Sequence, residues 1–419
     1  MAPMRKLVPA VAALLVLAGS LAAYAVYRLH QSRDHRGSAT VEFVPTEVPK
    51  QTRAHGRIIW RTFGYDNERL HAGPRTALRP PFRRVWVAGG TSLLEFPPAI
   101  AFHGLYLANA AGEVLAYSLK TGAQAWRYRT GHCTAASPAI GRYHHGTLYE
   151  TFLAPRPCTG GETHGGLVVA IATGDGKLRW KRSIGASESS PLLIGTHLYL
   201  GDSLGTIWCF RAGTGRLVWR FQAAGAVKGA LAAYRGRLYV GAYDGHVYAL
   251  SARTGKLIWR ASGDPRFLGG HGTFYSTPAV AYGRVYIGST DGKIYSFGAD
   301  SGKRRWSFST GGYVYGSPAV WHGRVYVGSY SHTFYALDAA TGSKVWSFHA
   351  SGPISGSATV INGIVYFASF DKHTYALDAR TGKLLWTFPD GRYTPVVTDG
   401  KKLYLLGYAK VYALAPRRR

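Results

Sequence analysis

The sequence predicts an all-β fold: an eight-bladed β-propeller of four-stranded blades, preceded by one apolar N-terminal helix. Three observations predict it: a motif that recurs about every 40 residues, a composition rich in Gly and aromatic residues, and terminal segments that complete one blade between them. The 419 residues include 53 Gly, 28 Tyr and 11 Trp, and only 17% are charged. An average soluble domain has roughly 25% charged residues. The composition therefore favours many short strands joined by turns over a disordered chain or a coiled coil.

A recurring segment that ends in Trp sets the period. The segment from Ala336 to Trp346 recurs with small changes from Ala249 to Trp259 and from Ala376 to Trp386. Upstream of it, each copy carries a Ser-Pro-Ala-Val type segment and then a Gly-Arg-Val-Tyr-Val-Gly type segment. A period of 40 to 50 residues built from strands is typical of propeller blades. Looser copies of the segment end at Trp126, Trp180, Trp219 and Trp306.

Each copy predicts four strands. The strand after Ser-Pro is innermost, and the Arg-Val-Tyr segment is the second strand. Turns such as Asp291-Gly292 supply the positive φ angles that a tight hairpin needs. A third strand then leads through a Gly-containing turn into the outer strand, which carries the Trp. Large apolar residues alternate along these strands, so we expect them and the Trp to pack against the next blade.

The two ends of the repeat region complete the eighth blade. Seven copies end at Trp386, and three further strands are predicted around 394–397, 403–406 and 410–414. The missing outer strand is predicted from Arg83 to Ala88, so the first strand pairs with the last and leaves no free edge between the terminal blades. The eight docking tryptophans are therefore Trp86, Trp126, Trp180, Trp219, Trp259, Trp306, Trp346 and Trp386.

The N-terminus predicts export. Residues 1–6 are short and basic, and residues 7–27 carry no charge. About 20 apolar residues span a bilayer as a helix, so residues 7–27 predict a transmembrane signal-anchor. A signal peptide cleaved at Ala23-Tyr24-Ala25 is the alternative. No Cys follows the run, which argues against a lipid anchor. We expect a single-pass cell-membrane protein with an extracytoplasmic propeller, or a secreted one if the signal is cleaved. Residues 28–57 show no periodicity and predict a polar linker.

The repeated pattern Ala-x-Asp-x-x-Thr-Gly-x-x-x-Trp resembles the tryptophan-docking motif of quinoprotein dehydrogenase propellers. It also resembles noncatalytic relatives named for pyrroloquinoline quinone (PQQ), including outer-membrane assembly lipoproteins of the BamB type. The resemblance covers about residues 58–415 and implies the PQQ-like propeller over residues 83–416. Trp60 and the segment from Phe63 to Asn67 resemble the leader that precedes the first blade in such proteins. The resemblance therefore implies that residues 58–82 pack on one face of the propeller.

The resemblance also separates catalytic from noncatalytic members. Catalysis in the family needs PQQ, a calcium ion held by Glu, Asn and Asp, and an Asp base. Two adjacent cysteines often lie beside the quinone, and this chain has no Cys-Cys pair. Glu188 is the only carboxylate that the repeat places at the start of an innermost strand. We therefore expect a noncatalytic, BamB-like propeller with no catalytic residue, cofactor or metal, and keep a PQQ-dependent dehydrogenase as an alternative.

Two insertions predict where a binding site lies. They fall around 153–166 and 264–275, on the face that also holds the loops entering the innermost strands. Function usually sits on such loops. A ring of Tyr, His and basic residues there suits an anionic ligand, a sugar-like ligand or a peptide. The expected channel-face residues are His132, His164, Glu188, Lys228, Arg266, His271, Tyr275, Tyr313, Tyr315 and Tyr393.

The three cysteines predict one disulfide. Cys133 lies just before an innermost strand, and Cys158 lies in the first insertion of the same blade. Export places both in an oxidising compartment, so we expect them to be bonded. Cys209 stands where other copies have Ala, which predicts a buried thiol.

The excess of basic over acidic residues indicates what kind of partner the protein binds. Fifty Lys and Arg residues against 21 Asp and Glu residues give a net charge of +29. Such a surface attracts anions. We expect a membrane-tethered monomer that acts as a noncatalytic binding or scaffolding module in the cell envelope. Its partner would be an envelope protein or an anionic polymer, and no specific nucleic acid is expected. The alternative binding function is a sensor for anionic cell-wall polymer.

Overall fold

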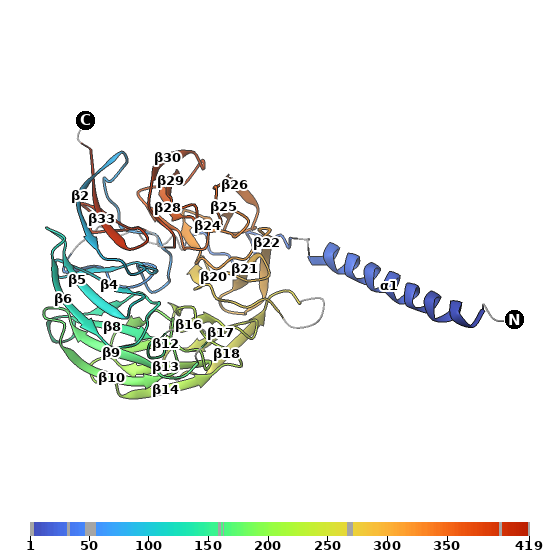
Figure 1. Cartoon of the computed structure of the whole chain (residues 1–419), viewed down its shortest axis with the longest axis horizontal. Helices are drawn as coiled ribbons and strands as arrows, with labels where there is room; N and C mark the ends of the chain where they lie inside the picture. The colour runs from blue at the N-terminus through green and yellow to red at the C-terminus, as the bar shows by residue number, and fades with distance from the viewer. Residues whose placement is uncertain are drawn as a thin grey trace.

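The computed structural model describes residues 4–31, 34–46, 56–157, 161, 163–265, 271–393 and 396–417. Within helix α1 (Met4–Gln31), side chains are described for residues 13–26. The described strands form eight antiparallel sheets, which follow one another around a ring (Figure 1). The predicted eight-bladed β-propeller is confirmed.

The first two strands of each blade lie nearest the centre of the ring. The innermost strands are β3 (Ala99–Ala101), β7 (Ala139–Gly141), β11 (Leu192–Ile194), β15 (Ala232–Tyr234), β19 (Ala279–Ala281), β23 (Ala319–Trp321), β27 (Thr359–Ile361) and β31 (Val397–Thr398). The second strands are β4 (Gly104–Asn109), β8 (Thr147–Phe152), β12 (His197–Gly201), β16 (Arg237–Gly241), β20 (Arg284–Gly288), β24 (Arg324–Gly328), β28 (Ile364–Ala368) and β32 (Leu403–Leu406). A short 3-10 turn, η1 (Tyr143–His145), joins β7 to β8.

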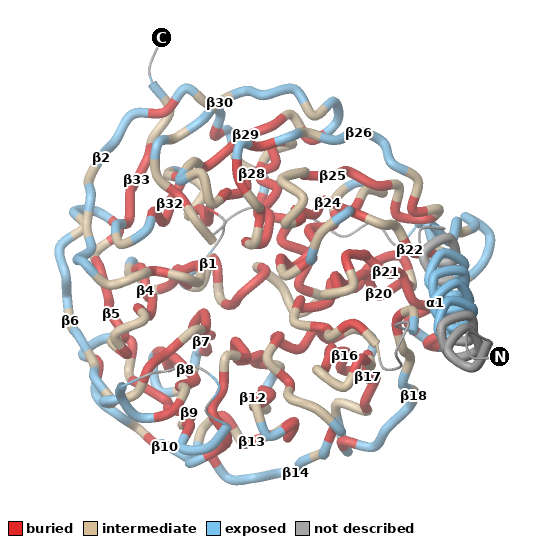
Figure 2. Tube along the Cα trace, turned by 45° about the vertical axis from the view of Figure 1, so that its right-hand side comes forward, coloured by how far each residue is buried: buried red, intermediate tan, exposed pale blue. Residues whose placement is uncertain are grey.

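The other two strands of each blade extend to the rim. The third strands are β5 (Glu113–Ser118), β9 (Gly166–Ala172), β13 (Thr206–Arg211), β17 (His246–Ser251), β21 (Lys293–Gly298), β25 (Thr333–Asp338), β29 (Thr374–Asp378) and β33 (Lys410–Pro416). The outer strands are β6 (Gln124–Arg129), β10 (Leu178–Ile184), β14 (Leu217–Gln222), β18 (Leu257–Ser262), β22 (Arg304–Ser309), β26 (Lys344–His349), β30 (Leu384–Phe388) and β2 (Phe82–Gly89). Figure 2 shows the exposed residues along the rim and the buried ones towards the centre.

The tryptophan of one blade docks on the Gly turn of the next. Trp306 donates its indole N–H to the carbonyl of Ala339 over 2.9 Å. A Cβ on Gly342, in the same turn, would lie 2.7 Å from the Trp306 ring, and the φ of Gly342 is +75°. Glycine is required because the ring lies against the backbone and the φ is positive. The same indole-to-carbonyl bond into the next blade is made by Trp86, Trp126, Trp180, Trp219, Trp259 and Trp346.

The seam of the ring joins the two ends of the repeat region. Strand β2 pairs with β33 in antiparallel register, from Phe82 opposite Pro416 to Gly89 opposite Lys410. The third and outer strands of this blade come from opposite ends of the chain, so no turn joins them. Trp386 instead packs edge-to-face on Phe82, with ring centroids 5.2 Å apart. The predicted closure by the first strand is confirmed.

A leader segment runs along the innermost strands at the centre of the ring. Its strand β1 (Ile58–Trp60) pairs with β3 and gives the first blade a fifth strand. Backbone carbonyls farther along the leader then accept bonds of 2.7–2.9 Å from the middle amides of five innermost strands. The acceptors are Arg61, Asn67, Glu68, Leu70 and His71, and the donors are Ile140, Ala233, Val280, Val320 and Val360. The leader therefore satisfies buried donors at the open edges of these strands, which would otherwise cost free energy.

Arg69 fixes the leader from inside the ring. Its side chain is fully buried. The Nε donates to the carbonyl of Leu231 over 2.8 Å, and Nη2 donates to the carbonyl of Pro191 over 3.2 Å. Nη1 donates to the hydroxyl of Thr62 and to the carbonyl of Phe63. One buried guanidinium thus ties two turns of the leader to two neighbouring blades.

Part of the predicted polar linker is docked on the propeller. Residues 34–46 lie against the blade made of β19 to β22, where Arg284 is fully buried and donates to the carbonyl of Glu42 over 2.6 Å. The Glu42 carboxylate forms an ion pair with Arg305 on β22. Residues 34–46 therefore differ from the expected linker, because they contribute carbonyls and a carboxylate that match two arginines on the side of one blade.

Helix α1 projects away from the ring (Figure 1). Its described large apolar side chains are exposed, among them Leu14, Leu15 and Leu17. Within the described part of the chain, no helix has both the length and the apolar character of a membrane span. The predicted membrane anchor at residues 7–27 is not supported by this finding.

Replacing Gly342 with Ala should lower the free energy of unfolding more than replacing Gly323 with Ala. The two residues have φ angles of +75° and +73°, so both changes impose similar backbone strain. Only Gly342 faces a Trp ring, because a Cβ on Gly323 would meet nothing within 4 Å. We expect an additional loss of about 1–3 kcal/mol for G342A in denaturant unfolding. Equal losses for the two variants would contradict the docking of Trp306 on this turn.

Candidate functional site

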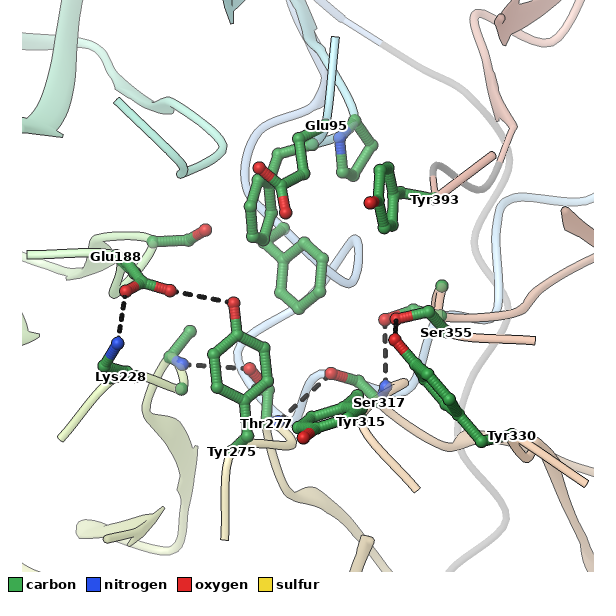
Figure 3. A pocket seen from close by; sticks show the side chains of 18 residues that line it. Glu95, Glu188, Lys228, Tyr275, Thr277, Tyr315, Ser317, Tyr330, Ser355 and Tyr393 are labelled. Atoms are coloured by element: carbon green, nitrogen blue, oxygen red, sulfur yellow. Dashed lines mark hydrogen bonds and ion pairs between the residues drawn. The ribbon is translucent and has the colours of Figure 1, made fainter. Parts of the chain in front are cut away.

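A cavity of about 260 Å³ lies at the end of the ring where the chain enters the innermost strands. Figure 3 shows its lining side chains gathered from several blades around one opening. The described lining residues are Phe63, Glu95, Phe96, Pro97, Glu188, Ser190, Lys228, Gly229, Ala230, Tyr275, Thr277, Tyr315, Ser317, Tyr330, Ser355, Gly356, Ser357 and Tyr393.

One position of the repeat supplies most of the polar and aromatic lining. In each blade, one innermost-strand residue pairs with a Tyr of the second strand, as Ala279 pairs with Tyr286. The residue four positions earlier points to the opening, and we call the eight residues at this position the mouth ring. In blade order they are Glu95, Ala135, Glu188, Lys228, Tyr275, Tyr315, Ser355 and Tyr393. All except Ala135 line the cavity.

Where a Ser or Thr follows the mouth-ring position by two residues, as Thr277, Ser317 and Ser357 do, it has a structural role. The hydroxyl of Ser357 accepts a 2.9 Å bond from the backbone amide of Ser317, and the hydroxyl of Ser317 accepts one of 3.1 Å from Thr277. The hydroxyl of Thr277 accepts a 2.9 Å bond from the amide of Ala230. These hydroxyls therefore join neighbouring blades and keep the mouth-ring backbone in place. These hydrogen bonds explain why the repeat carries a Ser-Pro element, so the Ser does not need a role as a catalytic nucleophile.

Glu188 is held by two neighbours from the mouth ring. Lys228 Nζ lies 2.7 Å from Glu188 Oε1, and the Tyr275 hydroxyl donates to Oε2 over 2.9 Å (Figure 3). Lys228 also lies over the ring of Tyr243, 5.4 Å from its centroid. Burial, followed by the nearby Glu188 charge, raises the pKa of Tyr275 well above its ordinary value. Glu188 therefore balances the positive charge of Lys228 within the described lining.

Glu95 is a second carboxylate at the cavity, and sequence analysis missed it. Burial is the main cause that raises the pKa of Glu95 from 4.5 to about 7, and repulsion from Glu188 adds to it. Arg392 acts in the opposite direction. The residue was missed because it belongs to the first blade, whose motif has lost the Ser of Ser-Pro. Aligning Glu95-Phe96-Pro97 with Tyr315-Gly316-Ser317 would have placed it at the mouth ring.

Aromatic rings form an arc along one side of the cavity. Tyr275 meets Tyr315 edge-to-face with centroids 5.5 Å apart, and Tyr315 meets Tyr330 at 5.2 Å. The arc continues from Tyr330 to Phe370 at 5.8 Å and from Phe370 to Tyr393 at 5.1 Å. We call these five residues the aromatic arc. Tyrosine ring faces carry negative electrostatic potential, so the arc presents electron-rich surface beside the two carboxylates.

The leader forms the floor of the cavity. Phe63 lines its base, and Arg69 lies beneath, 6.0 Å from the centroid of the Phe63 ring. His71 packs edge-to-face on the other side of Phe63 at 4.8 Å. Burial lowers the pKa of His71 to about 3, so this imidazole is neutral at physiological pH. The opening therefore leads to a pocket with a closed base.

Five of the expected channel-face residues meet at the cavity, and the others lie elsewhere. Tyr313 is half-exposed at its rim and packs against Tyr315, with centroids 5.8 Å apart. His132 pairs with Pro155 beside the first insertion, and His271 packs against His246 at 5.9 Å beside the second. His164 is exposed and contacts Thr163, while Arg266 lies outside the described residues. The five that line the cavity are Glu188, Lys228, Tyr275, Tyr315 and Tyr393.

The cysteines differ in their environment. Cys133 is disulfide-bonded. Its backbone pairs with the first insertion, since its carbonyl accepts a 2.8 Å bond from Leu153. Cys209 is a free, fully buried thiol, and burial raises its pKa to about 12. Cys158 lies outside the described residues, so its bond to Cys133 stays a prediction.

A family model described as outer membrane protein assembly factor BamB matches residues 52–192, 164–313 and 291–418. Together the matched ranges cover the leader and every blade. The chain belongs to this family. Among curated proteins, the outer membrane protein assembly factor BamB of Burkholderia pseudomallei (strain K96243) is 29% identical over 154 residues. That match covers 36% of this chain and 36% of the relative, so it spans about a third of the relative's length.

Solved structures of two functional types share the fold. BamB from Moraxella catarrhalis has a TM-score of 0.65 at 19% identity, over 80% of this chain and 100% of that one. A europium-containing methanol dehydrogenase has a TM-score of 0.72 at 12% identity, over 86% and 98% of the two chains. The quinohemoprotein alcohol dehydrogenase from Comamonas testosteroni has 0.69 at 14%, over 86% and 81%. At these identities the similarity shows the fold alone.

The quinone and metal of the dehydrogenases do not fit this lining. Glu188 already pairs with Lys228 and Tyr275, and Phe63 fills the base of the pocket. Among the described residues, no group of three or more His, Cys, Asp or Glu side chains could hold a metal ion. The cavity of about 260 Å³ also lies below the roughly 300–1,000 Å³ typical of small-molecule sites.

Replacing Glu95 with Gln should change how stability depends on pH. The pKa of Glu95 is about 7 in the folded chain and 4.5 ordinarily, so between these values the folded state keeps a proton that the unfolded state has lost. The free energy of unfolding of the wild type therefore falls as pH rises through this interval. Gln cannot ionise, so E95Q should gain about 1–3 kcal/mol relative to wild type between about pH 4.5 and pH 7.5.

Denaturant unfolding of both proteins across this pH range measures the difference. Asp66 also has a pKa raised to about 7 by burial, but it is present in both proteins and does not contribute to the difference. A stability difference that stays constant with pH would show that Glu95 titrates as an exposed carboxylate.

Proposed function

We propose that this chain is a noncatalytic binding module of the cell envelope that docks a partner protein at its mouth ring. The BamB family to which it belongs carries the name of an outer-membrane assembly factor, which supports an envelope role. The mouth ring carries the proposal. Its side chains differ from blade to blade, while the hydroxyls two residues later serve the scaffold. A position whose side chain differs between blades, while hydrogen bonds hold its backbone in place, is suited to recognising a partner rather than to stabilising the fold.

The size and depth of the cavity favour a protein partner over a cofactor. An open pocket of about 260 Å³ has room for one protruding side chain. Tyr313 and the Tyr rings beside it extend the aromatic surface to the rim, where Tyr313 is 51% exposed. Tyrosines around a small pocket are typical of protein interfaces, in which one anchor is buried and surrounding contacts exclude water.

We also propose that the N-terminal helix holds the propeller at the membrane, on the extracytoplasmic side. The exposed Leu14, Leu15, Val16 and Leu17 support this placement, because exposed apolar side chains favour a lipid or protein environment. The docked residues 34–46 would then fix the propeller close to the membrane surface. Removing residues 1–33 should release the chain from washed membranes, and retention in the pellet would contradict the anchor.

Site-specific photocrosslinking tests the docking surface. A photoreactive residue at Tyr313 should form adducts with an envelope protein in intact cells. The matched control is Val218, which is 37% exposed. It lies on outer strand β14, at the outer edge of the propeller and away from the mouth ring. We expect adducts from position 313 that are absent from position 218. The same adducts at both positions, or none at 313, would contradict docking at the mouth ring.

The rim supports a second candidate, binding of an anionic cell-wall polymer. Exposed basic side chains follow one another on the outer strands of five successive blades, and the chain carries a net charge of +29. Such an arc attracts polyanions and releases their counterions. The residues of this basic arc are Arg83, Arg84, Arg127, Arg129, Lys181, Arg182, Arg220 and Arg260.

Heparin affinity tests the basic arc. Binding should weaken steeply between roughly 50 and 200 mM salt, because each ionic contact displaces counterions. Replacing Arg83, Arg84, Arg127 and Arg129 with Ser should reduce the salt dependence of binding. If heparin does not retain the protein at low salt, the basic arc is not a binding site for polyanions.

A further inference from the structure

A second cavity lies at the other end of the ring from the mouth. It is found beside β1 and at the ends of the innermost strands β7 and β11, and β1 and β7 both lie near the centre of the ring (Figure 2). Its volume is about 610 Å³, within the roughly 300–1,000 Å³ typical of small-molecule sites. We call it the far-end pocket. Its described lining residues are Ile58, Arg61, Ile140, Gly141, Arg142, Tyr143, Leu193 and Gly195.

The lining of the far-end pocket combines positive charge with apolar surface. Arg61 and Arg142 carry the charge, and no Asp or Glu is among the described lining residues. Ile58, Ile140 and Leu193 supply the apolar part of the lining. Guanidinium groups match phosphate and carboxylate oxygens with paired N–H donors. This lining therefore suits an anionic group that carries an apolar substituent.

A longer connection in the second blade supplies part of this lining. The connection between β7 and β8 covers residues 142–146, whereas the connection between β11 and β12 covers only residues 195–196. Arg179 holds the longer connection in place, because it donates to the carbonyl of Tyr143 over 3.0 Å and to that of His144 over 2.8 Å. The backbone that carries the pocket residues of this connection is therefore fixed to the outer strand of its own blade.

Arg61 belongs to the leader, and its surroundings disfavour its charge. Burial is the main cause that lowers the pKa of Arg61, and the nearby Asp66 and Glu68 act in the opposite direction. The net lowering means that the two carboxylates do not make up for the water that the guanidinium has lost. The side chain also donates to the side-chain oxygen of Asn67, and an Arg stays protonated at physiological pH. An anion in the pocket would therefore stabilise this partly buried cation.

We propose that the far-end pocket binds a phosphate ester with an apolar substituent. The phosphate lies between Arg61 and Arg142, and the substituent packs against Ile58, Ile140 and Leu193. A phosphate monoester carries a charge of roughly −1.5 to −2 at neutral pH, which two guanidinium groups balance. Burial of the substituent against the apolar lining adds affinity. The inference goes beyond the proposed docking function, because this pocket and the mouth ring lie at opposite ends of the ring.

Three soluble probes test the two parts of the inference. Butyl phosphate carries the phosphate and an apolar chain, inorganic phosphate lacks the chain, and pentanoate carries a chain but only a single negative charge. Calorimetric titration of the full chain in a nonionic detergent should show affinity for butyl phosphate about tenfold higher than for either of the other probes. Equal affinity for butyl phosphate and inorganic phosphate would overturn the apolar contact. Equal affinity for butyl phosphate and pentanoate would overturn the recognition of phosphate.

Arg142→Ser provides the site-specific arm, and Arg253→Ser is its matched control. Both arginines are exposed, but Arg253 lies in the turn between β17 and β18 and is not among the described lining residues. R142S should lower the affinity for butyl phosphate about tenfold, because it removes a charged hydrogen-bond donor, whereas R253S should keep it. Equal losses in the two variants would show that butyl phosphate responds to the net charge of the protein, and would overturn the assignment to this pocket.

Two further esters distinguish the kinds of phosphate ester. Dihexanoyl phosphatidic acid carries a lipid headgroup with two short acyl chains, and glucose 1-phosphate carries its phosphate on a polar sugar. We expect the short-chain lipid to bind more tightly, and tighter binding of glucose 1-phosphate would overturn the role of the apolar lining.

The photocrosslinks at position 313 test the docking function separately. Crosslinks at this position without binding of butyl phosphate would overturn only the phosphate site. Binding of butyl phosphate that is lost in R142S, without any crosslink at position 313, would support the phosphate site and overturn only docking at the mouth ring.

Discussion

The hydrogen bonds between the leader and the innermost strands are the constraint on which the rest of the structure depends. A propeller blade leaves the inner edge of its first strand without a partner, and a buried amide without an acceptor is costly. Carbonyls of the leader accept bonds from five of these strands, and Arg69 ties the leader to Leu231 and Pro191. The leader thereby places Phe63 at the centre of the ring. The leader therefore closes the base of the central channel of the propeller, and the remaining space is a pocket that opens at the protein surface.

The repeat then divides its positions between scaffold and surface. The docking Trp and the Ser or Thr before the innermost strand make hydrogen bonds between neighbouring blades, and the Gly of the following turn lies against the Trp ring. Four residues before the paired innermost position, the chain emerges at the opening, where the side chains contact one another but do not repeat one bond from blade to blade. This difference explains why Trp recurs around the ring while the mouth ring holds Glu, Lys, Tyr, Ser and Ala.

Periodicity explains what the sequence could predict. The strands, the docking Trp residues and the seam between β2 and β33 follow from one repeat length, and five mouth-ring residues follow from the loops that enter the innermost strands. Glu95 was missed because the first blade lacks the Ser-Pro marker, although its alignment with the other copies contained the signal. The sequence also did not show that Lys228 would pair with Glu188, because the two residues belong to different blades.

Segments outside the repeat could not be placed in the same way. The docking of residues 34–46 depends on single contacts, such as Arg284 with the carbonyl of Glu42, and no sequence period records them. His132 and His271 were expected at the channel face from their position in the chain. His132 pairs with Pro155, and His271 packs against His246, so the two residues contact segments of the insertions or of a neighbouring strand and do not line the cavity.

Hydrogen exchange of the intact protein tests most directly whether the leader is part of the core. Peptides that cover residues 61–73 should exchange far more slowly than exposed turns, because the amides of Leu70, His71 and Gly73 donate to Asp66, Gly64 and Val360 inside the ring. Exchange of residues 61–73 at the rate of exposed turns, while the innermost strands stay protected, would contradict the account. The leader would then lie over a propeller that closes without it.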